Sequence, residues 1–297
     1  MKPLTGTIAV VAGATRGAGR GIACMLGEAG ATVYCTGRST RDSLVSTLRP
    51  ETIEDTAEMV TQYGGVGIPV RVDHLDKTQV EALFERVRHE HKQLDILIND
   101  IWGGEKLIEF GTPVWEMDID KGLQMLRTAL NTHIITSRYA LPLMVERKQG
   151  LVIEVTDGDT LDYRGNFIYD IAKTTVIRMA YGLSQELKSN GITALALTPG
   201  FLRSEEMLDH FGVTEANWQD ATKKDPHFIA SETPFFVGRA AAALASDPKV
   251  FEKTGKAFSS WNLSDEYGFK DITGDTPHWG RYFAEHVVPH MTETTPK

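Results

Sequence analysis

The stretch of residues 7–19, TIAVVAGATRGAG, places three glycines directly after an apolar run, with the spacing G-x-x-x-G-x-G. The run predicts a buried strand, and the apolar residues that recur at helical spacing after it predict a helix. A helix that begins at a glycine-rich turn offers unpaired backbone N–H groups to an anion, and glycines let a diphosphate approach the backbone. This context predicts a phosphate-binding turn, although its spacing differs from the common dinucleotide fingerprint G-x-G-x-x-G. The residues assigned to it are Gly13, Thr15, Arg16, Gly17 and Gly19.

Strand and helix patterns alternate along the whole chain. Strands are expected at residues 8–12, 32–36, 67–72, 94–98, 151–156, 192–198 and 256–260. Alternating βα units imply the α/β fold class, with a Rossmann-like, doubly wound parallel sheet of about seven strands in a three-layer sandwich. Ligands of such sheets bind outside the carboxyl ends of the strands. One domain is expected over residues 1–263, with a lid at 201–232 and a C-terminal extension at 264–297.

Composition narrows the classes of function. The chain has 297 residues and a formal net charge of −9, which disfavours nucleic acid and anionic membranes as partners and leaves a small molecule. No apolar run approaches the ~20 residues that cross a bilayer. The two cysteines, Cys24 and Cys35, fit a reducing compartment. Because the first strand also begins too early for a signal peptide, a cytoplasmic protein is expected.

A second motif, YDIAK at residues 169–173, lies in a helical pattern after the fifth expected strand. Residues four apart share one face of a helix, so Tyr169 and Lys173 face the same way. A phenol with a pKa near ~10 is a poor base at neutral pH, but a neighbouring ammonium stabilises the phenolate and lowers that pKa. Tyr169 is therefore the expected acid/base, which takes a proton from an alcohol or gives one to a carbonyl oxygen.

The two motifs together resemble the short-chain dehydrogenase/reductase family, over roughly residues 4 to 263. The resemblance implies a nicotinamide cofactor and hydride transfer at a carbonyl or alcohol carbon. It also implies that Lys173 holds the nicotinamide ribose. Members of the family are commonly homodimers or homotetramers built from the fourth and fifth helices.

The end of the second expected strand selects the dinucleotide. A carboxylate there would bind the adenosine ribose and repel a 2′-phosphate, but residues 36–40 read TGRST and contain no acid. Arg38 can pair with a phosphate, to which Ser39 and Thr40 can donate, and Arg16 supplies a second cation. These residues favour NADP(H) as the cofactor. The alternative is that Arg38 is a solvated loop residue and that cofactor specificity is relaxed.

Other cofactor contacts are implied by the resemblance alone. Asp73 and His74 match the pair that holds adenine, and Asn99 matches the first residue of the family's N-N-A-G motif. The rest of that motif is replaced by bulkier residues, so the loop beside the cofactor must be built differently. Residues 199–204 resemble the P-G-x-x-x-T motif that holds the carboxamide and the diphosphate. The residues of this motif assigned to the cofactor are Pro199, Gly200, Leu202 and Ser204.

The catalytic side departs from the family in two places. The family's serine, which hydrogen-bonds the substrate oxygen, is replaced by Asp157, with Thr156 beside it. Because an ionised carboxylate cannot donate, three alternatives stand: Asp157 is protonated, Thr156 substitutes for the serine, or Asp157 binds a donor on the substrate such as an amine or hydroxyl. The family's helical asparagine aligns with Ala129. Asn131 could replace it only through a bulge or a shifted register, so the proton relay is in doubt.

Histidine patterns do not predict a metal site. His286 and His290 have the spacing of helical ligands, but Pro289 interrupts the helix and no third ligand is evident. The segment His89-Glu90-His91 fits a solvated helix face.

The substrate expected is small to medium in size and aromatic or amine-bearing. Aromatic residues that form either a lid or part of the core are Trp102, Phe201, Phe211, Trp218, Phe228, Phe235 and Phe236. One alternative function is an NADP(H)-binding sensor or scaffold with little turnover. Another is epimerisation or dehydration on the same fold, although family members of that kind often have larger substrate domains.

Overall fold

The computed structural model describes residues 2–45 and 49–289, and within them the strands form one seven-stranded parallel sheet. The order in the sheet is β3-β2-β1-β4-β5-β6-β7. The strands are β1 (Ile8–Ala12), β2 (Thr32–Gly37), β3 (Val66–Arg71), β4 (Ile96–Asn99), β5 (Gly150–Val155), β6 (Ile192–Thr198) and β7 (Ala257–Ser259). Each expected strand is present, and the predicted fold class is confirmed.

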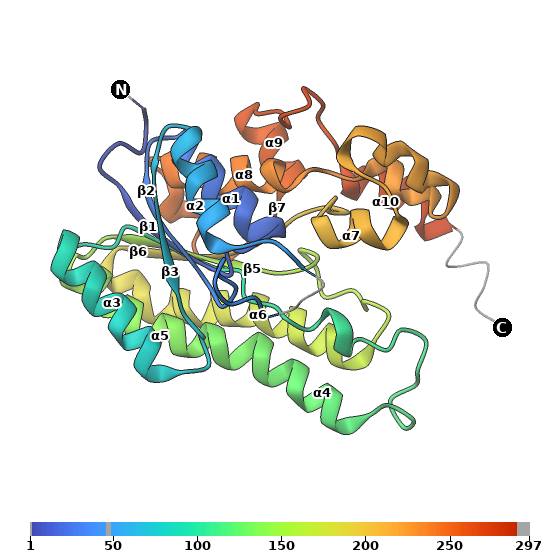
Figure 1. Cartoon of the computed structure of the whole chain (residues 1–297), viewed down its shortest axis with the longest axis horizontal. Coiled ribbons are helices and arrows are strands. Elements are labelled where there is room, and N and C mark those ends of the chain that lie inside the picture. Colours follow the sequence, from blue (N-terminus) through green and yellow to red (C-terminus); the bar gives the residue numbers. More distant parts are fainter. Residues whose placement is uncertain (1, 46–48, 290–297) are drawn as a thin grey trace.

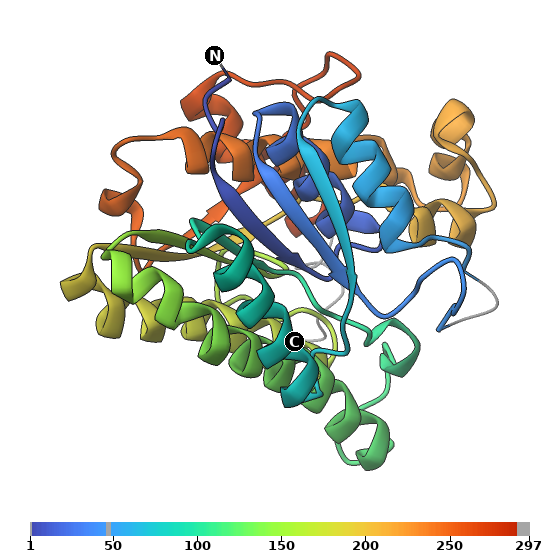
Figure 2. The same ribbon diagram turned by 60° about the vertical axis from the view of Figure 1, so that its left-hand side comes forward.

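Helices cover both faces of the sheet and make three layers (Figures 1 and 2). One layer contains α1 (Gly17–Glu28), α2 (Ile53–Gln62), α8 (Pro234–Ser246) and α9 (Ser260–Tyr267). The other contains α3 (Lys77–His91), α5 (Thr132–Arg147) and α6 (Phe167–Leu187). Successive strand residues point to opposite faces, so Val11 packs in the first layer and Val10 in the second. The strands are therefore almost continuously apolar, as strands buried on both faces must be.

Local signals set where the helices begin. Thr52 caps α2 by accepting a hydrogen bond from the Asp55 N–H at 3.2 Å. Asn166 caps α6 and accepts from the Tyr169 N–H at 3.0 Å. That cap places Tyr169 in the first turn of α6, directly beside the carboxyl end of β5.

Glycines hold α1 against α8 at very short distance. A Cβ added to Gly21 would lie 1.9 Å from the Pro234 carbonyl oxygen, and one added to Gly238 would lie 2.4 Å from that of Gly21. Neither contact tolerates a side chain, so α1 is held tightly over the sheet. The N-terminus of α1, which carries the glycine turn, is positioned by this packing.

Residues 201–232 form an excursion from the sheet that begins with α7 (Glu205–Phe211). Its two ends are joined, because the Glu232 N–H donates to the Phe201 carbonyl at 2.9 Å. Phe211 and Phe228 are buried in a small hydrophobic cluster that lies within residues 201–232. The C-terminal extension runs back over the same end of the sheet and forms α10 (Trp279–His286) (Figure 1). The remaining helix, α4 (Ile119–Leu126), precedes α5.

Candidate active site

A cavity of about 810 Å³ opens at the carboxyl ends of the strands. It brings together most residues that the sequence assigned to the site. Those that line it are Gly13, Thr15, Arg16, Gly17, Arg38, Asp73, His74, Asp157, Tyr169, Lys173, Pro199, Gly200, Leu202 and Ser204. Gly19, Ser39 and Asn99 are not among the lining residues. Trp279 and Val287 also line the cavity, so the C-terminal extension contributes to its wall.

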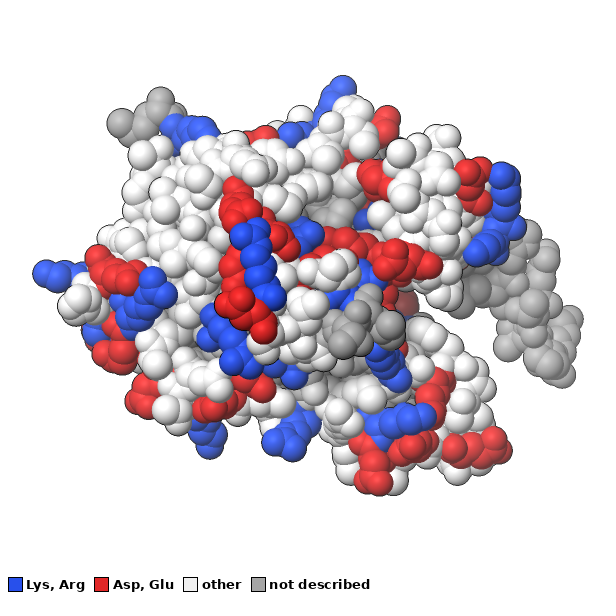
Figure 3. Space-filling model, in the orientation of Figure 1, with Lys and Arg blue, Asp and Glu red and all other residues white. Residues whose placement is uncertain are grey.

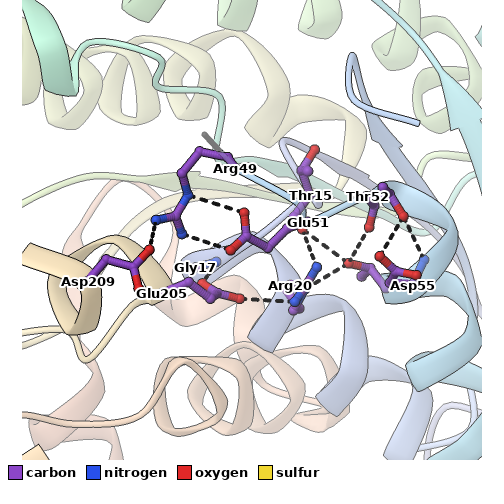
Figure 4. A network of polar contacts seen from close by, with 10 residues as sticks. Thr15, Gly17, Arg20, Arg49, Glu51, Thr52, Asp55, Glu205 and Asp209 are labelled. Carbon is purple, nitrogen blue, oxygen red and sulfur yellow. Dashed lines mark hydrogen bonds and ion pairs between the residues drawn. The ribbon is translucent and has the colours of Figure 1, made fainter. Parts of the chain in front are cut away.

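The glycine turn has the backbone geometry that requires glycine. Gly13 has a φ of +95° and a Cβ there would lie 2.4 Å from the Asp100 carbonyl oxygen. Gly19 is needed for packing, since its Cβ would lie 2.3 Å from the Gly13 carbonyl oxygen. The Gly17 N–H donates to Glu205 Oε2 at 2.8 Å, and Glu205 also pairs with Arg20 (Figure 4). An acid on α7 therefore caps the N-terminus of α1, which the sequence did not predict.

Two arginines in the cavity have no acidic partner among the described residues. Arg16 and Arg38 form no ion pair there, and Arg38 is exposed. By contrast, Arg20 pairs with Glu205, and Arg49 pairs with both Glu51 and Asp209 (Figure 4). Figure 3 shows acidic and basic side chains side by side near the centre of one face, with no broad basic patch on its described part. Free cationic charge is thus available at the place where a cofactor phosphate was expected.

His74 directs its ring into the interior. Both ring nitrogens are hydrogen-bonded, to the hydroxyls of Thr36 and Thr136, each at 2.8 Å. Burial lowers the pKa of His74 to about 3, so the ring is neutral. Asp73 accepts from the Leu75 N–H at 3.0 Å and shapes the turn after β3. These contacts occupy both ring nitrogens of His74, and both Asp73 and His74 border the cavity.

Asn99 belongs to a buried polar network beneath the cavity. Its Nδ2 donates to Glu154 Oε1 at 2.8 Å and to the Ser137 hydroxyl at 3.0 Å. His133 Nδ1 lies 2.5 Å from Glu154 Oε2, and His133 Nε2 donates to the Ile101 carbonyl at 3.1 Å. The network fastens the loop after β4, which replaces the usual N-N-A-G turn. Glu154 in the middle of an apolar strand was the sequence signal that could have revealed it.

The Tyr169 hydroxyl donates to Asp157 Oδ2 at 2.6 Å. Asp157 thus lies where the substrate-binding serine was expected. Burial, followed by the charge of Asp157, raises the pKa of Tyr169 well above its ordinary value. Both effects favour the protonated phenol and oppose the lowering of the pKa of Tyr169 that is expected from Lys173.

Lys173 lies between rings and carboxyl groups. Its ammonium is 4.0 Å from the centroid of the Trp102 ring and 5.7 Å from that of Tyr169. Burial lowers the pKa of Lys173, whereas the charges of Asp157, Asp100 and Glu105 act in the opposite direction. Trp102 also packs edge-on against Tyr169 at 5.4 Å. The tyrosine and the lysine therefore share one aromatic wall.

The two candidate substitutes for the family's polar residues differ in position, because Thr156 lines the cavity and Asn131 does not. The Thr156 hydroxyl donates to the Lys173 carbonyl at 2.7 Å, so it is committed to the backbone. The segment Arg127–Asn131 is π-helical, which is the bulge that could have shifted the register. Even so, Asn131 is exposed and Ala129 is buried at the aligned position. No asparagine of this segment reaches the cavity.

Two further acids of the cavity were not anticipated. Burial raises the pKa of Asp100 to about 7, and it also raises the pKa of Glu105. Both follow β4 in the loop that departs from the family motif. Of the aromatic residues considered for a lid, Trp102 and Phe201 line the cavity. Phe211, Trp218 and Phe228 pack within residues 201–232, while Phe235 and Phe236 pack against the main core or Phe269.

Comparison with known proteins decides the family. A model of the short chain dehydrogenase family matches residues 7–212. The chain belongs to the short-chain dehydrogenase/reductase family. It is 34% identical to "Dehydrogenase/reductase SDR family member 1" of Mus musculus and 32% identical to that of Homo sapiens, in each case over 92% of this chain and 85% of the relative.

Two further proteins show a more distant similarity. An uncharacterized oxidoreductase of Staphylococcus aureus is 28% identical over 77% of this chain and 90% of its own length. A crystal structure of a short-chain dehydrogenase/reductase from Burkholderia xenovorans superimposes with a TM-score of 0.71 at 22% identity, covering 87% of this chain and 96% of the other. The family makes this chain an oxidoreductase that acts on a small molecule with a nicotinamide cofactor.

The described residues contain neither a cluster of metal ligands nor a membrane-spanning helix. No three His, Cys, Asp or Glu side chains there are placed to hold a metal ion, and His290 lies outside those residues. No helix in the same ranges is long and apolar enough to cross a bilayer.

Proposed function

We propose that the chain is an NADP(H)-dependent oxidoreductase that exchanges a hydride with a carbonyl or alcohol carbon of a small to medium substrate. Tyr169 is the acid/base and Lys173 its electrostatic partner. The observation that carries the proposal is the Tyr169 hydroxyl, hydrogen-bonded to Asp157 at the cavity wall, one helical turn from Lys173. A phenol so placed can deliver a proton to an oxygen in the cavity.

Fit to the cofactor is supported by the donor set of the cavity. Gly13 carries no side chain beside the N-terminus of α1, and Arg16 and Arg38 form no ion pair with a described acid. A bound diphosphate would replace Glu205 as the acceptor of the Gly17 N–H. The two cations suit a 2′-phosphate and favour NADP(H) over NAD(H). Residues 199–204 are expected to hold the nicotinamide end. The bound cofactor would supply or accept the hydride there.

The hydrogen bond to Asp157 constrains the substrate. The Tyr169 hydroxyl has one proton, and in this structure that proton is donated to Asp157. A substrate with its own donor, such as an amine or hydroxyl, could bind Asp157 and leave the phenol proton free for the reacting oxygen. Trp102, Phe110 and Phe201 line the same cavity and suit an aromatic substrate.

The test begins with fluorescence titration of the protein with NADPH and NADH. A panel of ketones, aldehydes and imines that bear amines or hydroxyls is then followed by loss of NADPH absorbance. We expect Tyr169→Phe to reduce turnover by about a hundredfold or more while NADPH binding is retained, because general acid catalysis is lost. Tyr163→Phe is the matched control, since Tyr163 is 66% exposed and does not line the cavity.

A second candidate, a dinucleotide-binding sensor with little turnover, is favoured by two observations. Asp157 holds the phenol protonated, and Ala129 occupies the place of the relay asparagine. NADPH binding without oxidation by any compound of the panel would favour the sensor. Failure to bind either dinucleotide would overturn both candidates.

Assembly and location are part of the same proposal. We infer a homodimer or homotetramer built through α5 and α6, where Ile134 is 56% and Tyr181 41% exposed. A cytoplasmic location is inferred from the cysteines, because Cys24 and Cys35 are both free and buried.

A further inference from the structure

Glu232 is a buried carboxyl group to which the proposed reaction gives no role. The residue is 1% exposed. Its Oε2 accepts hydrogen bonds from the Gly200 N–H at 2.9 Å and from the Ser260 hydroxyl at 2.6 Å. Its Oε1 has no hydrogen-bond partner among the described residues. If Glu232 were ionised, both of its hydrogen-bond donors would lie on Oε2. The free-energy cost of burying the charge would then be poorly compensated.

The backbone of Glu232 holds the same segment as its side chain. Its N–H donates to the Phe201 carbonyl at 2.9 Å, and its carbonyl accepts from the Arg203 N–H at 2.8 Å. A Cβ added to Gly200 would lie 2.9 Å from Glu232 Oε2 and 2.7 Å from the Trp279 Cβ. Glu232 thus binds three successive parts of the segment that is expected to hold the nicotinamide end of the cofactor.

Little charge is available to balance an ionised Glu232. The ionisable groups that face it are Asp271, in the loop after α9, and Arg203, in the segment after β6. Asp271 is an acid and is itself bound by the Thr233 N–H at 2.9 Å. Arg203 forms an ion pair with Glu215 at 3.1 Å, so its positive charge is already largely balanced by that acid. Burial, as the largest cause, raises the pKa of Glu232 to about 8, so the neutral form predominates at pH 7.

We propose that neutral Glu232 is the positioning residue that holds residues 200–203 for the nicotinamide end of the cofactor, and that loss of its proton weakens dinucleotide binding. The inference rests on the proposed function. Ionisation would place a negative charge in the interior beside another acid, Asp271. The segment would then have to open to bring water to Oε1, at the expense of the contacts with Gly200 and Phe201.

The test is the pH dependence of the NADPH dissociation constant, measured by fluorescence. For the wild type we expect a constant value near neutral pH and a rise that approaches about tenfold per pH unit above a midpoint near 8. Glu232→Gln keeps an oxygen for Gly200 and cannot ionise, so it should bind as the wild type does at pH 7 and lack the rise. Ser260→Ala removes a donor that favours the ionised form, so its midpoint should move to higher pH.

Matched variants separate this inference from its alternatives. Ser259→Ala is the control for Ser260→Ala, because the neighbouring Ser259 is buried but its hydroxyl has no partner among the described residues. It should leave the midpoint unchanged. A rise that persists in Glu232→Gln would assign the titration to another group, such as Lys173, and overturn the inference.

An unmoved midpoint in Ser260→Ala would also overturn it, and this variant decides the matter if Glu232→Gln does not fold. If the wild type binds NADPH but its dissociation constant does not rise at alkaline pH, the inference is refuted and the proposed function is not. A wild type that binds no dinucleotide at any pH would refute the proposed function together with the inference.

Discussion

The two halves of the cavity are built by different means. On the side of β1 and β2 the wall consists of backbone groups, glycines and two unpaired arginines, Arg16 and Arg38. On the side of β5 and β6 it depends on acids in contact with other groups, among them the half-buried Asp157 and the buried Glu232. A dinucleotide can be recognised by local geometry and point charge. Catalysis depends on protonation states, which a single exchanged side chain alters.

Replacement of Asp157 by Asn should give the largest change among variants that sharpen this contrast. Removing the carboxylate lowers the pKa of Tyr169, so the phenolate forms at lower pH. We expect the rate of alcohol oxidation at neutral pH to rise by about tenfold or more and its pH profile to move to lower pH, with an alcohol that has no amine.

The control for this variant is Asp159→Asn, two residues along the same loop, since Asp159 does not line the cavity. A pH profile that stays in place in Asp157→Asn would show that the carboxylate does not govern the phenol. The proposed difference between the two halves would then be lost.

Replacement of Arg38 by Ala probes the other half. A charge-assisted hydrogen bond is worth about 1.5–3 kcal/mol, so we expect NADPH to bind about tenfold to a hundredfold more weakly, with NADH little changed. Titration with both dinucleotides measures the ratio. Arg41→Ala is the control, because Arg41 is paired with Asp55 and Glu58. Equal losses for NADPH and NADH would contradict a role in reading the 2′-phosphate.

Replacement of Asn131 by Ala should give the smallest effect. Asn131 is exposed on the π-helical segment and does not line the cavity. We expect turnover within about twofold of the wild type and a change in unfolding free energy below about 0.5 kcal/mol. A tenfold loss of turnover, with thermal stability unchanged, would restore the asparagine relay that the structure does not support.

The fold could be predicted because its signals are local. The glycine spacing and the apolar strand patterns each act within a few residues, and every expected strand is present. The predicted bounds are least accurate for β4, which begins at Ile96 rather than at residue 94. Asp95 was included although its side chain accepts from the Ile8 N–H at the strand end.

The site could be predicted only in part, since its energetics depend on residues far apart in sequence. The direction of the Tyr169 pKa depends on burial and on Asp157, neither of which the spacing of Tyr169 and Lys173 contains. The contact of Glu205 with the Gly17 N–H joins residues 188 positions apart. The hydrogen bonds of the His74 ring likewise reach Thr36 and Thr136, which are 38 and 62 positions away.

The place of Trp279 and Val287 in the cavity wall has a consequence for engineering. No strand of the sheet and no residue of the glycine turn belongs to residues 279–287, so exchanging this stretch between homologues would reshape its wall of the cavity while the glycine turn and Arg38 stay in place. For the same reason an affinity tag is better fused ahead of β1 than behind α10. A library of chimeras that vary only in this stretch would be a compact way to redirect selectivity.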